Sequence, residues 1–84
     1  MQRNVLITLL EQRKETAEKV QKILTGWGCV IRTRFGLHQG VLDDCSNSGL
    51  IILELVGEDK DHEELERKLN LLSGVNARLV KMNI

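Results

Sequence analysis

Apolar and polar residues alternate along this chain with two periods, one typical of strands and one typical of helices. An alternation of period two predicts four strands, in residues 4–11, 29–37, 49–56 and 75–82. Apolar residues spaced three and four apart predict two amphipathic helices, in residues 13–26 and 59–73. The predicted order of elements is therefore β-α-β-β-α-β.

This order predicts one arrangement in space. A strand, its crossover helix and the next strand need roughly 25 to 30 residues, which each half of the chain provides. Right-handed crossovers place both helices on the same face of the sheet. We expect an α+β fold of the ferredoxin-like βαββαβ type, with a four-stranded antiparallel sheet and two helices on one face. A chain of 84 residues is long enough for one such domain, so residues 1–84 are assigned to it.

The sheet face away from the helices is expected to be too apolar for simple exposure to water, because a bare antiparallel face is normally polar. The simpler interpretation is a partly solvated face with scattered aliphatic residues. We favour a partner surface and expect a homodimer or a tetramer. The interface candidates are Leu6, Thr8, Leu10, Arg32, Arg34, Ile52 and Glu54, with Arg78 and Val80 on the same face.

Composition and charge narrow the functional classes. Twelve basic residues balance twelve acidic ones, whereas nucleic-acid binding is driven by an excess of Lys and Arg. One Phe, one Trp and no Tyr leave few rings for stacking RNA bases. The apolar-rich run near the N-terminus, from Val5 to Leu10, is far shorter than the about 20 residues of a membrane span. We expect a cytoplasmic protein that contacts neither a membrane nor nucleic acid.

Motifs of known enzyme classes are absent from the sequence. It contains no GxxxxGK[ST] phosphate-binding loop, no dinucleotide fingerprint, no HExxH and no GxSxG. Two cysteines, Cys29 and Cys45, are too few for a disulfide framework. We therefore expect a protein that is not an enzyme and that has no catalytic residues and no cofactor.

The candidate binding site is the long connection between the second and third predicted strands. Hairpin loops usually have two to five residues, whereas the irregular part of residues 35–50 has about ten. Long loops in compact domains often carry function. The connection predicts a pocket for a small-molecule effector, and the alternative is a solvated loop without a ligand. The candidate ligand-binding residues are Gly36, His38, Gly40, Asp44, Cys45, Ser46 and Asn47.

Several residues have the chemistry of metal ligands but no recognised spacing. His38 and Cys45 are the candidates, and Cys29, Asp44 and His62 are also of suitable type. His62 falls in the acidic first turn of the second predicted helix, where a surface or capping role accounts for it. Cys29 begins a predicted strand, where a cysteine is usually a small buried residue. No metal site is therefore assigned.

Three segments resemble a known family. They are RTRFGLH at 32–38, NSGLIILELVGE at 47–58 and LNLLSGVNARLVKM at 69–82. They resemble the small iron-only hydrogenase system regulators, a group of transcriptional regulators with an ACT-like fold, over nearly the whole chain. That family is similar in fold to the C-terminal domain of nickel-responsive repressors, which assemble through their sheets and bind metal between subunits. The resemblance implies a dimeric or tetrameric regulatory module, with an effector, commonly an amino acid, at a subunit interface.

The chain departs from the nickel-responsive repressors in two respects. Because residues 1–84 are assigned to one domain, we expect no separate ribbon-helix-helix arm of the kind that grips DNA, and no basic patch takes its place. The chain has only two histidines, His38 and His62, instead of the several that a nickel site uses. We therefore expect no direct nucleic-acid binding by this chain alone.

Two functional hypotheses follow. The first is a homo-oligomeric regulatory module that senses a small ligand through residues 36–49. The second is an accessory protein of hydrogenase or redox metabolism that handles a metal or a thiol through Cys45 and Cys29. Replacing Cys45 with serine separates them, because only the second function requires the thiol.

Overall fold

The computed structural model describes residues 1–11, 14–38 and 48–84. It confirms the predicted order of elements, and the predicted bounds differ from the observed ones by at most three residues. The elements are β1 (Gln2–Glu11), α1 (Lys14–Gly26), a short 3-10 turn η1 (Gly28–Val30), β2 (Ile31–His38), β3 (Ser48–Leu55), α2 (Asp59–Asn70) and β4 (Val75–Asn83).

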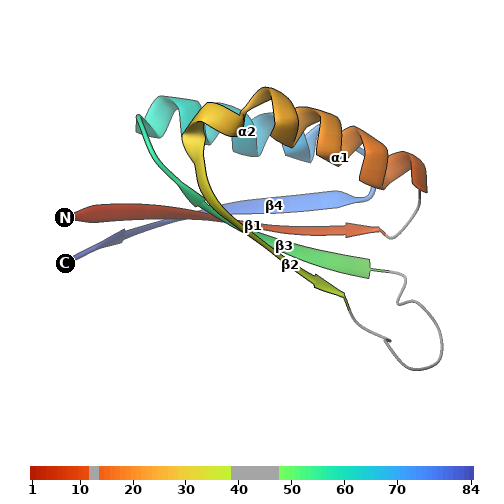
Figure 1. Cartoon of the computed structure of the whole chain (residues 1–84), viewed down its shortest axis with the longest axis horizontal. Coiled ribbons are helices and arrows are strands. Elements are labelled where there is room, and N and C mark those ends of the chain that lie inside the picture. The colour runs from red at the N-terminus through yellow and green to blue at the C-terminus, as the bar shows by residue number, and fades with distance from the viewer. Residues whose placement is uncertain (12–13, 39–47) are drawn as a thin grey trace.

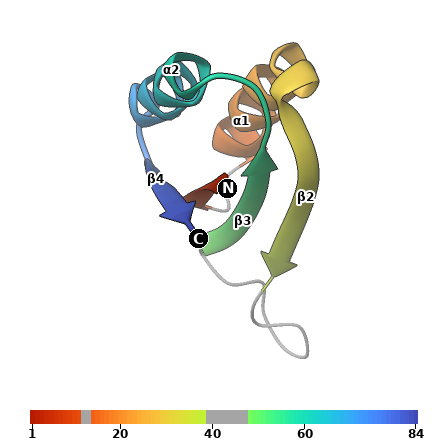
Figure 2. The ribbon, with the colours of Figure 1, turned by 90° about the vertical axis from the view of Figure 1, so that its left-hand side faces the viewer.

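The strands form one antiparallel sheet in the order β2-β3-β1-β4. Both helices lie on the same face of this sheet, as Figures 1 and 2 show from two directions. The fold is therefore the ferredoxin-like βαββαβ arrangement that the sequence predicts. β1 and β3 are the central strands, and β2 and β4 form the two edges.

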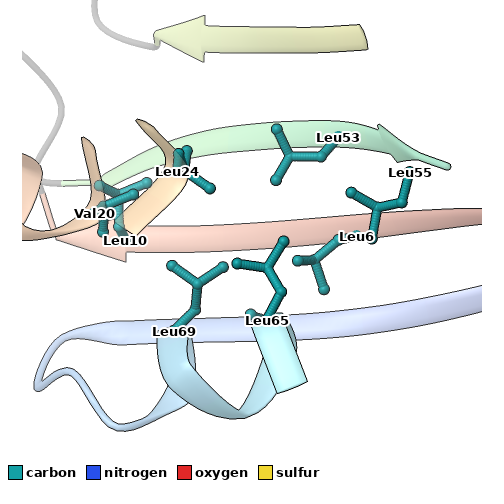
Figure 3. Close-up of a cluster of buried hydrophobic side chains, with 9 residues drawn as sticks. Leu6, Leu10, Val20, Leu24, Leu53, Leu55, Leu65 and Leu69 are labelled. Atoms are coloured by element: carbon teal, nitrogen blue, oxygen red, sulfur yellow. The ribbon is translucent and has the colours of Figure 1, made fainter. Parts of the chain in front are cut away.

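The core lies between the helices and the sheet and consists mainly of leucines (Figure 3). Burying one such side chain stabilises the fold by roughly 1.5 to 3 kcal/mol. In the part of the chain that the structure describes, no helix is long and apolar enough to cross a membrane. The buried hydrophobic residues are Leu6, Leu10, Val20, Leu24, Leu53, Leu55, Leu65, Leu69 and Ala77.

The predicted faces of β1 are inverted in the structure. Leu6, Thr8 and Leu10 point towards the helices and are 0%, 1% and 6% exposed, whereas Ile7 and Leu9 are 37% and 49% exposed. β1 is apolar on both faces, and a shift of one residue moves every side chain to the opposite face of a strand. The prediction that Leu6, Thr8 and Leu10 form an oligomer interface is therefore wrong, because they are core residues.

A bulge changes the faces of β2. Ile31 pairs with Leu55 and Thr33 pairs with Glu54, so Arg32 is an extra residue without a counterpart on β3. Ile31 consequently packs against the core, and Thr33 and Phe35 point to the other face. Arg34 is on the helix side, where its Nη1 donates a hydrogen bond of 2.8 Å to Gln21 of α1. The placement of Arg34 on the outer sheet face is therefore also wrong.

Side chains of α2 cover the outer edge of β4. Asn70 Nδ2 donates to the carbonyl oxygen of Ala77 at 2.9 Å, and Asn70 Oδ1 accepts from the Ala77 amide at 2.7 Å. Glu66 Oε2 accepts from the Leu79 amide at 2.6 Å. An edge strand with free backbone groups is a template for pairing with other chains, and these contacts occupy such groups on β4.

Candidate functional site

The open face is the side of the sheet away from the helices, and it combines aliphatic and charged side chains. Phe35 and Met82 are 55% and 60% exposed on this face. Large apolar patches on a protein surface commonly mark interaction sites. By strand register and exposure, the open face consists of Arg3, Val5, Ile7, Leu9, Thr33, Phe35, Leu50, Ile52, Glu54, Asn76, Arg78, Val80 and Met82.

Two of the predicted interface residues, Ile52 and Glu54, are on this open face. Glu54 Oε2 is 3.3 Å from Arg3 Nη1, and Glu54 Oε1 accepts a hydrogen bond of 3.1 Å from Thr33. Arg78, opposite Ile7, has no hydrogen bond or ion pair within residues 1–11, 14–38 and 48–84. The open face therefore holds one paired and one unpaired guanidinium among its aliphatic residues.

A polar pocket of about 310 Å³ lies at the end of the sheet where β1 and β2 begin and β3 leads into α2. It joins residues from three strands and one helix, and most of its lining is polar or charged. The pocket is lined by Met1, Gln2, Arg3, Asn4, Arg32, Glu54, Leu55, Val56, Gly57, Asp59 and His62.

A buried hydrogen-bond network forms the floor of this pocket. Asn4 Nδ2 is 2.7 Å from His62 Nδ1 and 2.9 Å from Asp59 Oδ1. His62 Nε2 is 2.8 Å from the carbonyl oxygen of Val56. Because an amide nitrogen can only donate and a carbonyl oxygen can only accept, His62 is the neutral tautomer that carries its proton on Nε2.

His62 is only 2% exposed, so the predicted surface or capping role is wrong. Both of its ring nitrogens are engaged within the protein, which leaves neither one for a metal. The network instead ties the start of α2 to β1 and to the end of β3.

Asp59 is held as a carboxylate by its neighbours. Hydrogen bonds from the side chains of Asn4 and Gln2, together with the nearby charge of Lys81, lower the pKa of Asp59 below its ordinary value of 3.8. The Lys81 Nζ atom is 3.6 Å from Asp59 Oδ2. Asp59 is therefore ionised at neutral pH and already has donors from three residues.

The turn between β3 and α2 shapes the pocket wall. Gly57 has a φ of +96°, a conformation that is open to glycine and strained for other residues. The Val56 amide donates a 2.8 Å hydrogen bond to the Val30 carbonyl and so fixes the turn against the start of β2. Gly57 lies between a predicted strand and the acidic start of a predicted helix, and this pattern in the sequence could have indicated the turn.

The position of Asn4 in the sequence could also have indicated a buried hydrogen bond. It stands on the helix-facing side of β1, in line with Leu6 and Thr8, and is 3% exposed. A polar residue in a core-facing position needs a hydrogen-bond partner. The sequence does not reveal that the partner is His62, which is 58 positions away.

Most of the predicted loop site lies outside the described residues. This holds for Gly40, Asp44, Cys45, Ser46 and Asn47. Gly36 and His38 belong to β2 and are strand residues, not loop residues. The strand residues His38 and Gly49 pair with each other at the end of the sheet opposite to the polar pocket.

The metal and thiol candidates are not brought together by the described structure. Cys29 is exposed in η1, before β2 begins, so the prediction of a buried strand cysteine is wrong. Cys45 lies beyond the described residues. Among the residues that the structure describes, no group of three or more His, Cys, Asp and Glu side chains could hold a metal ion.

No protein-family model matches the chain, and no curated protein matches it in sequence. Solved structures do share its fold. An uncharacterized protein from Thermotoga maritima is 24% identical with a TM-score of 0.86, covering 99% of this chain and 100% of that one. The ACT domain of GTP pyrophosphokinase from Chlorobium tepidum is 15% identical with a TM-score of 0.70, covering 95% of this chain and 97% of that one.

A third similar structure is CPII, a nitrogen regulatory PII-like protein from Thiomonas intermedia, determined with bound ADP, AMP and bicarbonate. It is 12% identical with a TM-score of 0.63, covering 100% of this chain and 93% of that one. At these levels of identity the comparisons show the fold. The chain therefore has the ferredoxin-like architecture of ACT domains and PII-like proteins.

Proposed function

We propose that this chain is a ligand-sensing regulatory module that works as a homo-oligomer and not as an enzyme. The observation that carries this proposal is the open face, which exposes Ile7, Leu9, Phe35, Val80 and Met82 on a sheet that is covered by helices on its other side only. The shared fold with an ACT domain and a nitrogen regulatory PII-like protein supports the regulatory part.

A second copy of the chain fits the open face in area. Four strands about 4.8 Å apart and eight to ten residues long span a projected area of about 500 to 600 Å². The accessible area of a face covered by side chains is larger than its projection. Specific interfaces bury roughly 600 to 1,000 Å² per partner, so pairing of two open faces falls near the lower end of this range. The zero net charge of the chain adds no overall repulsion between copies.

More specifically, we propose that the chain is a transcriptional regulator of the iron-only hydrogenase system type and that it is located in the cytoplasm. Its support is the resemblance of residues 32–38, 47–58 and 69–82 to that family. The chain would act by changing its assembly or its contacts with a partner protein when its effector binds, and would not bind DNA alone.

Thermal unfolding at fixed protein concentration tests the proposal. The panel contains amino acids, ADP, AMP, bicarbonate and divalent metals, and the fluorescence of Trp27, the single tryptophan, reports unfolding. A ligand at 100 times its dissociation constant stabilises the folded state by about 2.7 kcal/mol. In a domain of this size we expect that stabilisation to raise the midpoint by roughly ten degrees or more.

Each ligand that raises the midpoint is then tested by sedimentation for a change in assembly. A sensor is supported by a compound that does both. If no compound of any class raises the midpoint, the chain does not sense a small effector and the proposal is wrong.

A further inference from the structure

Arg32 lines the polar pocket and has no polar partner in the part of the chain that the structure describes. It is the extra residue of the β2 bulge, and bulges redirect side chains near functional sites. Its side chain is exposed and lines the pocket beside Val56 and Gly57. Within the described residues it makes no hydrogen bond and no ion pair.

The other charged groups that line the pocket are already engaged. Glu54 accepts from Arg3 and from Thr33. Asp59 accepts from Asn4 at 2.9 Å and from Gln2 at 3.3 and 3.4 Å, and the Lys81 ammonium is also near. The two carboxylates therefore have protein donors, whereas the guanidinium of Arg32 has five N–H donors and no protein acceptor among the described residues.

We propose that this pocket binds a small molecule that carries an oxyanion, a carboxylate or a phosphate, and that Arg32 holds that oxyanion through its guanidinium. The planar guanidinium matches both groups with two parallel hydrogen bonds. A volume of about 310 Å³ is at the lower end of the range of about 300 to 1,000 Å³ for ligand pockets. The occupant is thus a small acid or a phosphorylated metabolite of similar size.

The rigid floor of the pocket supports specific binding. Asn4 and His62 are 3% and 2% exposed and are locked to each other and to Val56. The wall at Gly57 is fixed by the Val56 to Val30 hydrogen bond. A preorganised site loses little conformational entropy when its ligand binds.

The pocket gives the effector of the proposed function a location and a chemical class. Only the regulatory role of that effector rests on the proposed function. The pocket also places the effector at the end of the sheet opposite to the His38–Gly49 pair of β2 and β3. Binding at Arg32 can be measured whether or not the chain forms oligomers.

The test is a titration of the ¹⁵N-labelled chain, followed by amide NMR signals, with sodium phosphate and separately with sodium acetate at constant ionic strength. These ions have only about four or five heavy atoms, so millimolar affinity is expected. The reporters are the backbone amides of Val56 and Gly57 and the side-chain amide of Asn4. Arg32→Gln is compared with Arg78→Gln. The control removes from the open face an exposed guanidinium that has no partner among the described residues.

We expect saturable shifts at the three reporters in the parent chain and in Arg78→Gln, with affinity weakened about tenfold or more in Arg32→Gln. Arg32→Lys should also bind more weakly than the parent, because an ammonium cannot form the paired contact. Tighter binding of phosphate or of acetate identifies the oxyanion. Absence of saturable shifts with both ions, or equal affinity in Arg32→Gln and Arg78→Gln, overturns the inference. The proposed function would survive that result if another ligand shifted the unfolding midpoint.

Discussion

Buried polar residues in the described structure differ in whether their hydrogen bonds are satisfied. Asn4 and His62 satisfy each other's hydrogen bonds at the floor of the pocket. Thr8 Oγ1 is buried without a hydrogen-bond partner in the part of the chain that the structure describes. A satisfied buried group positions its neighbours, whereas an unsatisfied one costs free energy.

Replacing His62 with alanine should destabilise the fold by about 2 to 3 kcal/mol. The substitution leaves the Val56 carbonyl without its donor and Asn4 with one acceptor fewer, in a buried place. Urea unfolding followed by Trp27 fluorescence measures the loss. The control is Lys60→Ala in the same helical turn, where both partners of the Lys60–Glu58 pair are exposed and the cost is expected within about 0.5 kcal/mol. Equal losses in the two variants would contradict the structural role of His62.

Replacing Thr8 with valine should stabilise the fold by roughly 1 kcal/mol. Valine has the same shape, and the change removes a hydroxyl whose burial is not compensated by a hydrogen bond. The same urea experiment measures the gain. A loss of stability in Thr8→Val would mean that the hydroxyl has a partner that this account lacks.

The hydrogen bonds to Asp59 predict a pH dependence. A carboxyl group whose folded-state pKa is lowered stabilises the fold above its unfolded-state pKa, and this contribution disappears as the pH falls through the folded-state value. The stability difference between the parent chain and Asp59→Asn should therefore be constant above about pH 5 and shrink below the ordinary value of 3.8. Urea midpoints of both proteins between pH 7 and 2.5 measure it. A difference that does not change with pH would exclude the effect.

The burial of some of these residues could be predicted from the sequence, whereas the contacts of others could not. Core-facing leucines of the helices follow from their spacing of three and four. The pairing of Asn4 with His62 does not follow, because it joins residues 58 positions apart and depends on the register of β1. Arg32 was predicted as an interface residue, and its place in the pocket does not follow from the sequence, because a bulge is set by how β2 pairs with β3.

At the scale of elements, the order and type of every helix and strand follow from periodicity, but the faces of β1 do not. Val5, Ile7 and Leu9 are as apolar as Leu6 and Leu10, so the pattern of β1 alone leaves two equivalent assignments. Tertiary packing selects between them by placing Leu6 and Leu10 beneath the helices. The cap on the edge strand β4 also depends on tertiary packing, because it comes from the side chains of Asn70 and Glu66 in α2.

The cap on β4 predicts local protection from hydrogen exchange. Asn70→Ala removes the acceptor of the Ala77 amide, so that amide should exchange faster by about tenfold. The Leu79 amide, which Glu66 holds, serves as the control within the same protein and should keep its protection. Unchanged exchange at Ala77, or equal acceleration at both amides, would show that Asn70 does not cap the strand.

At the scale of the whole molecule, the open face and the polar pocket adjoin each other, because Arg3 and Glu54 belong to both. The helices cover one face of the sheet, the polar pocket occupies one end, and the open face exposes aliphatic residues. The sequence predicted a partner surface on this face and assigned the wrong residues of β1 to it. The partner surface stays a prediction, and it now includes Ile7 and Leu9 in place of Leu6 and Leu10.

Assembly through the open face can be measured as the molecular mass in solution. Sedimentation equilibrium over a range of concentrations should give at least twice the monomer mass for the parent chain. Phe35→Lys places a charge on the open face, where Phe35 is 55% exposed, and should shift the equilibrium to the monomer because burying that charge is costly. Leu71→Lys is the matched control, since Leu71 is 70% exposed at the end of α2 and away from the open face. A parent chain that stays monomeric at all concentrations, or equal dissociation by both variants, would contradict assembly through the open face.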